Sequence, residues 1–124
     1  MPLTLAGGYR MNREQERKYL EESPEAAAYL NRMGLRPNSD GFRYLIFVIN
    51  QLRRGTPFPN TYWGVTALYF GINKEDLMRA IQDEIDAAYL SEPGRFRAFK
   101  NPNLVGRAPD VDTFLNQVLH DLNR

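Results

Sequence analysis

The strongest hydrophobic pattern in the chain lies between residues 42 and 54, where apolar side chains recur at helical spacing. One face carries Phe42, Leu45, Ile46, Ile49 and Leu52, with Phe47 and Val48 beside it. A helix that is apolar on most sides is typical of the buried centre of a domain. The β-branched run could also form a strand, but no second strand of comparable length is present to pair with it. We therefore predict a central helix over 42–54.

The chain before this helix carries clear start and stop signals. Ser23 and Pro24 are suited to the N-cap and the first position of a helix, and Gly34 stands where its C-terminal cap belongs. The turn residues of 36–41 predict a loop. Further upstream we expect a weakly anchored helix over 12–22 and a flexible tail over 1–11.

Three more helices are predicted after the centre. The two prolines of 55–60 break the chain. Helices over 61–70 and 73–89 follow, separated by Gly71. Residues 91–109 are predicted to form a long loop, with one short turn inside it as an option. Asp110 then caps a last helix, whose apolar stripe consists of Phe114, Leu115, Val118, Leu119 and Leu122.

These elements predict an all-α, compact domain of about five to six helices, formed by residues 12–124. The composition, 43% hydrophobic and 25% charged, is that of a globular protein. No apolar run approaches eighteen residues and the start lacks a signal peptide, so we expect no membrane association. The absence of cysteine excludes disulfides and thiolate metal sites and fits a cytoplasmic protein.

The segment 63–82 has the spacing of a helix-turn-helix. Counted from Trp63 as the first position of the motif, Ala67 is at the fifth, where a larger side chain would collide with the second helix. Gly71 is at the ninth position, where the turn favours positive φ. Leu77 is at the fifteenth, where it packs back on the first helix. In that geometry the second helix presents its N-terminal end to the DNA major groove.

The order of several short motifs resembles a known family. They are Gly34-Leu35, Gly41-Phe42-Arg43-Tyr44-Leu45, Ile49, Ala67 to Phe70, Leu77, Arg79-Ala80-Ile81 and Pro109-Asp110-Val111-Asp112-Thr113-Phe114-Leu115. Over about 33–124 the chain resembles the C-terminal DNA-binding effector domain of the sporulation-initiation response regulator (stage zero sporulation protein A family). The resemblance implies an all-helical domain that binds DNA as a tandem dimer and acts in transcription and sporulation.

Two features depart from that family. About 32 residues precede the similar part, too few for the family's receiver domain, so the family's phosphoryl switch is not assumed. The second helix is also acidic: residues 74–92 have a balance of −4, whereas 41–73 carry three cations and 93–109 four, both without acids. Asp76 and Asp83 would oppose binding to the phosphates of DNA.

Candidate DNA contacts follow from side-chain chemistry. Arg79 can bond guanine, Asn73 or Gln82 can bond adenine, and Glu75 or Asp76 can accept from cytosine. The cations that could hold phosphates are Lys74, Arg95, Arg97 and Lys100, together with Arg43, Arg53, Arg54 and Arg107.

Each of these residues also has a structural interpretation. Glu75 and Asp76 suit the positive end of the helix dipole, and Arg79 could pair with Glu75 or Asp83. The phenylalanines of the 91–109 loop could pack on the domain while its cations stay in water. Tyr62, Trp63 and Tyr69 are expected in the core. His120 alone is a poor metal site.

The sequence therefore supports two functions. The first is a sequence-specific transcriptional regulator that binds double-stranded DNA, with a homodimer as one option. The alternative is a protein-interaction module that keeps the helix-turn-helix fold but has an acidic second helix and a protein partner. No catalytic motif, metal site or cofactor site is present, so we do not expect an enzyme.

Overall fold

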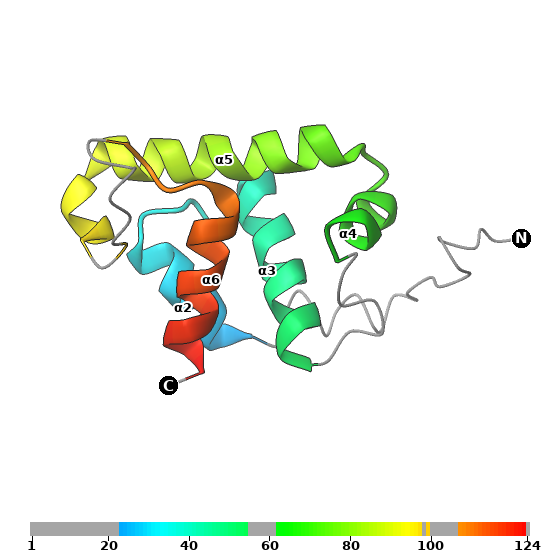
Figure 1. Cartoon of the computed structure of the whole chain (residues 1–124), viewed down its shortest axis with the longest axis horizontal. Coiled ribbons are helices and arrows are strands. Elements are labelled where there is room, and N and C mark those ends of the chain that lie inside the picture. The colour runs from blue at the N-terminus through cyan, green and yellow to red at the C-terminus, as the bar shows by residue number, and fades with distance from the viewer. Residues whose placement is uncertain (1–22, 55–61, 98, 100–106, 124) are drawn as a thin grey trace, which may run out of the picture.

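A computed structural model describes residues 23–54, 62–97, 99 and 107–123 (Figure 1). This part is all-helical, without strands, as the sequence predicts. Its elements are α2 (Pro24–Arg32), α3 (Asp40–Arg54), α4 (Tyr62–Phe70), α5 (Lys74–Ser91), the short 3-10 helix η1 (Pro93–Phe96) and α6 (Val111–Leu122). The predicted tail over 1–11, the helix over 12–22 and the break over 55–60 lie outside the described residues.

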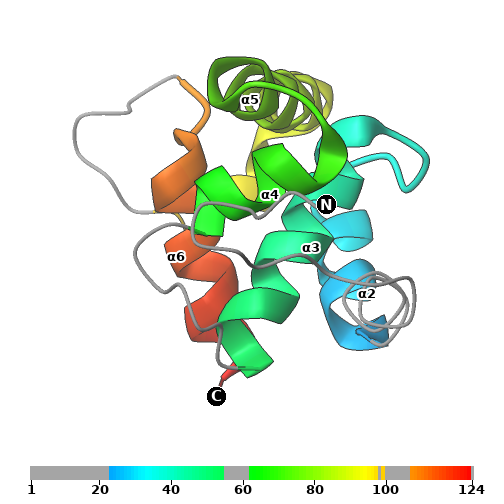
Figure 2. The same cartoon turned by 90° about the vertical axis from the view of Figure 1, so that its right-hand side faces the viewer.

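Helix α3 is the centre of the fold, as its apolar pattern predicts. It packs against α2, α4, α5 and α6. Figures 1 and 2 show α5 lying across one end of α3, with α2 and α6 on one side and α4 on the other. The residues from α3 that are less than 5% exposed are Leu45, Ile46, Phe47, Val48, Ile49, Asn50 and Gln51.

Helix α2 begins and ends at the predicted residues, but one predicted interaction is wrong. Pro24 is the first helical residue after Ser23. The Ser23 hydroxyl makes no cap; it donates to the Asn50 side chain and ties α2 to α3. Gly34 has φ of +97°, and the amides of Gly34 and Leu35 donate to the carbonyls of Asn31 and Leu30. This Schellman motif ends the helix.

Helix α3 begins at Asp40, two residues earlier than predicted, so the loop over 36–41 is shorter than expected. The Ser39 hydroxyl oxygen accepts from the Phe42 amide 3.2 Å away and caps the helix. A glycine in the first turn is needed because α5 lies so close: a Cβ on Gly41 would stand 2.6 Å from the carbonyl oxygen of Ala80.

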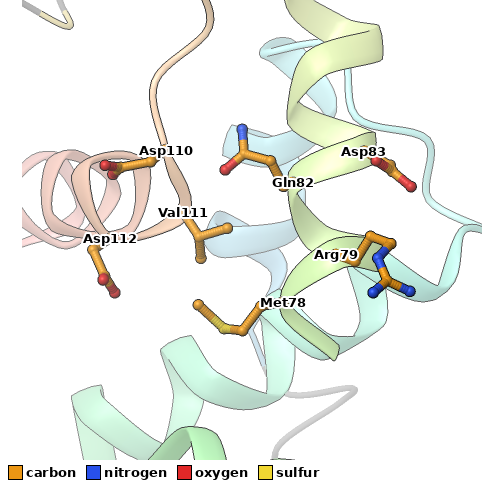
Figure 3. Close-up of a pocket in the computed structure, with 7 residues that line it drawn as sticks. All are labelled: Met78, Arg79, Gln82, Asp83, Asp110, Val111 and Asp112. Carbon is orange, nitrogen blue, oxygen red and sulfur yellow. The ribbon is translucent and has the colours of Figure 1, made fainter. Parts of the chain in front are cut away.

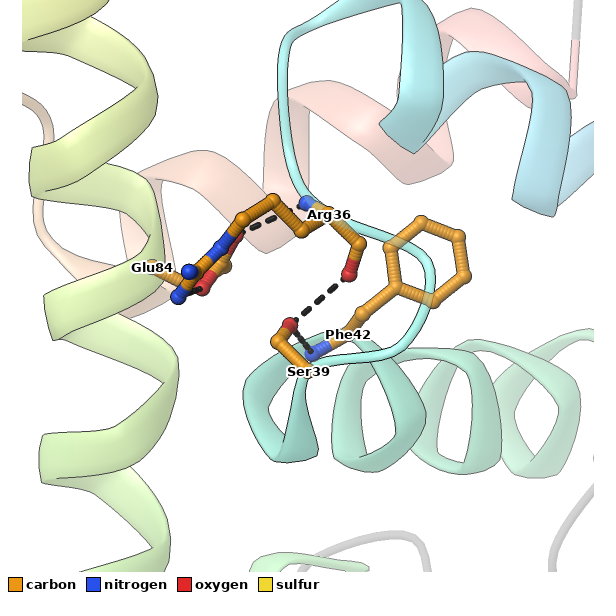
Figure 4. A network of polar contacts seen from close by, with 4 residues as sticks. All are labelled: Arg36, Ser39, Phe42 and Glu84. Carbon is orange, nitrogen blue, oxygen red and sulfur yellow. Dashed lines mark hydrogen bonds and ion pairs between the residues drawn. The ribbon is translucent and has the colours of Figure 1, made fainter.

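A charged contact joins the loop before α3 to α5 (Figure 4). Glu84 is 4% exposed, and its carboxylate accepts from the Arg36 amide at 2.7 Å and from the guanidinium at 2.9 and 3.1 Å. Burial raises the pKa of Glu84, but the hydrogen bonds and charge of Arg36 outweigh it, so the pKa is lowered overall. Glu84 was not among the residues singled out from the sequence.

Helix α6 closes the domain with its predicted cap and stripe. The Asp110 side chain accepts from the Thr113 amide at 2.8 Å. Phe114, Leu115 and Val118 are at most 1% exposed, while Leu119 and Leu122 are partly buried. Helix α5 ends at Ser91, two residues later than predicted, and η1 is the one short turn foreseen within the loop over 91–109.

Candidate nucleic-acid interface

Helices α4 and α5 are joined by a tight turn at the predicted glycine. Gly71 has φ of +73°, and the amides of Gly71 and Ile72 donate to the carbonyls of Leu68 and Ala67. Asn73 then caps α5, its side-chain oxygen accepting from the Asp76 amide at 2.8 Å. The glycine C-cap at Gly71 and the asparagine N-cap at Asn73 are separated by one residue, so the chain changes direction within three residues.

The inside of this turn is packed by the residues expected there. Ala67 is 5% exposed and Leu77 is fully buried, while Phe70 and Ile72 are partly buried against the core. Trp63, 8% exposed, is in the core as expected, and Tyr69 stacks on Phe47 with 5.0 Å between ring centroids. In Figure 1 α5 lies lengthwise and α4 is seen nearly end-on, so the two helices cross steeply.

The N-terminal end of α5 is open to solvent. Asn73, Lys74, Glu75, Asp76 and Arg79 are all exposed. The Arg79 guanidinium lies 3.1 Å from the Asp76 carboxylate. Its ion-pair partner is therefore Asp76, one of the two acids expected to oppose DNA binding, and neither Glu75 nor Asp83.

Gln82 is engaged in the fold. Its amide nitrogen donates to the Asp86 carboxylate at 3.0 Å and to the Pro109 carbonyl at 2.9 Å. These bonds tie α5 to the segment before α6. A hydrogen bond donated by the Gln82 amide to a base would have to replace one of these two contacts.

A third cation borders the turn. The Arg43 guanidinium lies 5.5 Å from the centre of the Phe70 ring, which ends α4. It also lies 3.5 Å from the Asp40 carboxylate. Arg43, Lys74 and Arg79 are thus the described cations nearest the turn, and acidic side chains accompany two of them.

A groove of about 410 Å³ lies between α5 and the start of α6 (Figure 3). Met78 and Val111 point toward one another at its floor. Asp110 and Asp112 lie on the α6 side, while Arg79 and Asp83 lie on the far side of α5. The groove therefore combines an apolar floor with three carboxylates, those of Asp83, Asp110 and Asp112, and one guanidinium, that of Arg79.

The predicted phosphate-binding residues are not brought together. Helix α5 has 18 residues and so spans about 27 Å, which separates Lys74 from Arg95 and Arg97. Arg95 lies 3.3 Å from Glu92 and packs over Gly34, where a Cβ would stand 2.3 Å from its guanidinium. Arg97 is exposed. Lys100 lies outside the described residues.

Other kinds of site find little support in the described part of the chain. It holds no group of three histidine, aspartate or glutamate side chains placed to bind a metal ion, and His120 is exposed on α6. None of its helices has the length and apolar character that a membrane crossing requires. Comparison of the chain with known protein families, curated proteins and solved structures finds no match.

Proposed function

We propose that this domain binds double-stranded DNA and regulates transcription, with the N-terminal end of α5 in the major groove. The observation that carries the proposal is the glycine turn that sets α5 across α4 and leaves residues 73–76 and Arg79 exposed. The family resemblance noted in the sequence supports the same orientation. Major-groove recognition by such a pair of helices uses the first residues of the second helix.

Arg79 is the central residue of the proposed contact. It is exposed, it stands in the second turn of α5, and its only ion-pair partner in the described part of the chain is an exposed carboxylate. An exposed pair contributes little to stability, so exchanging Asp76 for the O6 and N7 atoms of guanine is feasible. Lys74 and Arg43 then contact phosphates on either side of the turn.

The test is binding to a duplex library, followed by measurement on the selected sequence. Arg79→Ala should weaken binding to that sequence by about 1–3 kcal/mol and remove the preference at one base position. Lys74→Gln should weaken binding to all duplexes alike. It should also reduce the slope of the logarithm of the binding constant against the logarithm of salt concentration by about one. Arg32→Ala, on α2, is the matched control and should change neither. Equal, weak affinity for every duplex would overturn the proposal.

A gain-of-affinity variant makes the test sharper. Asp76→Asn removes a negative charge from the proposed interface and frees Arg79, so duplex affinity should rise. Glu25→Gln makes the same change of charge on α2, where Glu25 pairs with Arg53. If both variants raise affinity equally, net charge explains the effect and α5 is not the contact surface.

The acidic groove favours a second candidate, a protein-interaction module. Its Met78–Val111 floor, flanked by Asp83, Asp110 and Asp112, is complementary to a basic amphipathic segment. A helical peptide of lysine and leucine is a suitable probe. Asp83→Lys combined with Asp112→Lys should abolish its binding, and Arg79→Ala should not weaken it. Binding that survives the double reversal would exclude the groove.

A further inference from the structure

The far end of α5 carries a second hollow, separate from the turn and from the acidic groove. It has a volume of about 210 Å³ and lies where the last turns of α5, η1 and the segment before α6 meet. In Figure 1 this is the end of the molecule where η1 lies, opposite α4. Its position about 27 Å along α5 makes it independent of the proposed DNA contact.

Two arginines provide the charge of this hollow. Arg97 follows η1 and Arg107 precedes α6, both are exposed, and neither has an ion-pair partner among the described residues. No carboxylate is among the described residues that line the hollow. This contrasts with Arg36, Arg43, Arg53, Arg79 and Arg95, each of which lies within 4 Å of an acid. Two uncompensated guanidinium groups match a dianionic phosphate monoester.

Three aromatic rings and two prolines, Pro93 and Pro109, provide the rest of the described lining. Tyr89 and Phe96 meet edge to face at 5.5 Å, and Phe96 lies 5.4 Å from Phe99. Phe99 is held in turn by stacking on Phe114, with ring centroids 5.4 Å apart and planes at 12°. Such rings, fixed by the core on one side, offer faces and edges to a planar ligand.

We propose that this hollow, defined by Tyr89, Phe96, Arg97, Phe99 and Arg107, binds a mononucleotide. The phosphate lies between Arg97 and Arg107, and the base packs on the aromatic side chains, chiefly Phe99 and Tyr89. The volume, below the 300–1,000 Å³ of pockets for drug-sized ligands, suits one nucleotide that stays partly in solvent. The proposal does not depend on DNA binding by α5.

The experiment is calorimetric or NMR titration of the full chain with adenosine 5′-monophosphate. Adenosine, ribose 5-phosphate and inorganic phosphate are the comparison ligands. The monophosphate should bind at least tenfold more tightly than each of the three, because only it carries both ring and phosphate. A strand with a 5′-phosphate, compared with the same strand without it, shows whether a nucleic-acid end is accepted through the same chemistry.

Substitutions then locate the site. Arg97→Gln and Arg107→Gln should each lower the affinity for the monophosphate at least tenfold, and Arg107→Lys should lower it less than Arg107→Gln. Phe99→Leu should lower the affinity for the monophosphate more than it lowers the affinity for ribose 5-phosphate. Arg95→Gln, which makes the same change of charge within η1, is the matched control and should leave affinity within twofold.

Several outcomes would overturn the proposal. One is that ribose 5-phosphate or adenosine binds as tightly as the monophosphate. Another is that the Arg95→Gln and Arg97→Gln variants lose equal amounts of affinity for the monophosphate. Loss of DNA binding in the Arg79→Ala variant with nucleotide affinity unchanged would separate the two sites. Nucleotide binding that fails while Arg79-dependent DNA binding persists would reject this proposal and leave the function above intact.

Discussion

At the scale of single residues, Gly41 sets how closely α3 and α5 approach. A methyl group there would stand 2.6 Å from the Ala80 carbonyl oxygen and 3.1 Å from the Glu84 Cβ. Backbone cannot rotate away as a flexible side chain can, so Gly41→Ala should lower the free energy of unfolding by about 1–3 kcal/mol. Urea unfolding followed by Trp63 fluorescence measures this. An unchanged midpoint would mean that the two helices are further apart.

Glu84 makes part of the stability depend on pH. Its pKa in the folded chain is held below the ordinary value of 4.5 by Arg36, against the opposing effect of burial. The carboxylate therefore stabilises the fold above pH 4.5 and loses this effect as pH falls through the folded pKa. Glu84→Gln should be destabilising at pH 7 and approach the parent protein at the acid end. Thermal melts between pH 2 and 8, with Glu25→Gln as control, measure the difference.

At the scale of elements, two glycines of the α4 region have opposite roles. Gly71 adopts φ of +73°, whereas Gly64 lies within α4 and a Cβ on either residue would meet nothing within 4 Å. Gly71→Ala should therefore cost about 1–2 kcal/mol through its left-handed backbone alone. Gly64→Ala should stabilise by up to about 1 kcal/mol, because alanine favours helix. Equal effects in chemical unfolding would contradict the left-handed backbone conformation at Gly71.

The same elements explain which boundaries the sequence predicts. Asn73 and Asp110 each accept from the amide three residues on, and Gly34 and Gly71 adopt positive φ; these are local interactions that local sequence encodes. The start of α3 is predicted two residues late because Gly41 is a turn residue. A glycine is required at this position by the close approach of α5, which lies far away in the sequence. The Ser23 hydroxyl likewise has a tertiary partner, Asn50, in place of the amides of its own helix.

At the scale of the whole molecule, tertiary contacts decide which candidate site residues can act together. Helical spacing predicted Glu75 or Asp83 as the ion-pair partner of Arg79, whereas its partner is Asp76. Gln82 was predicted as a base-contacting residue, but the Pro109 carbonyl, 27 residues away, engages its amide. Arg95 and Arg97 were grouped with Lys74 only because all three side chains are positively charged. The length of α5 separates them from Lys74. Helical spacing could have revealed Glu84, which falls on the face shared with Ile81 and Ala88.

Because α3 contacts all the other α-helices, we expect the described part of the domain to unfold as one cooperative unit. Phe114 on α6 is fully buried and Trp63 on α4 is 8% exposed, and both belong to the core cluster that includes α3. Phe114→Ala should cost about 3–5 kcal/mol, and it should shift the unfolding midpoint of Trp63 fluorescence as much as that of helical circular dichroism. Phe114→Leu, which keeps most of the volume, should shift both by less. A Trp63 transition that stays in place while the helical signal moves would show that α4 unfolds independently of α6.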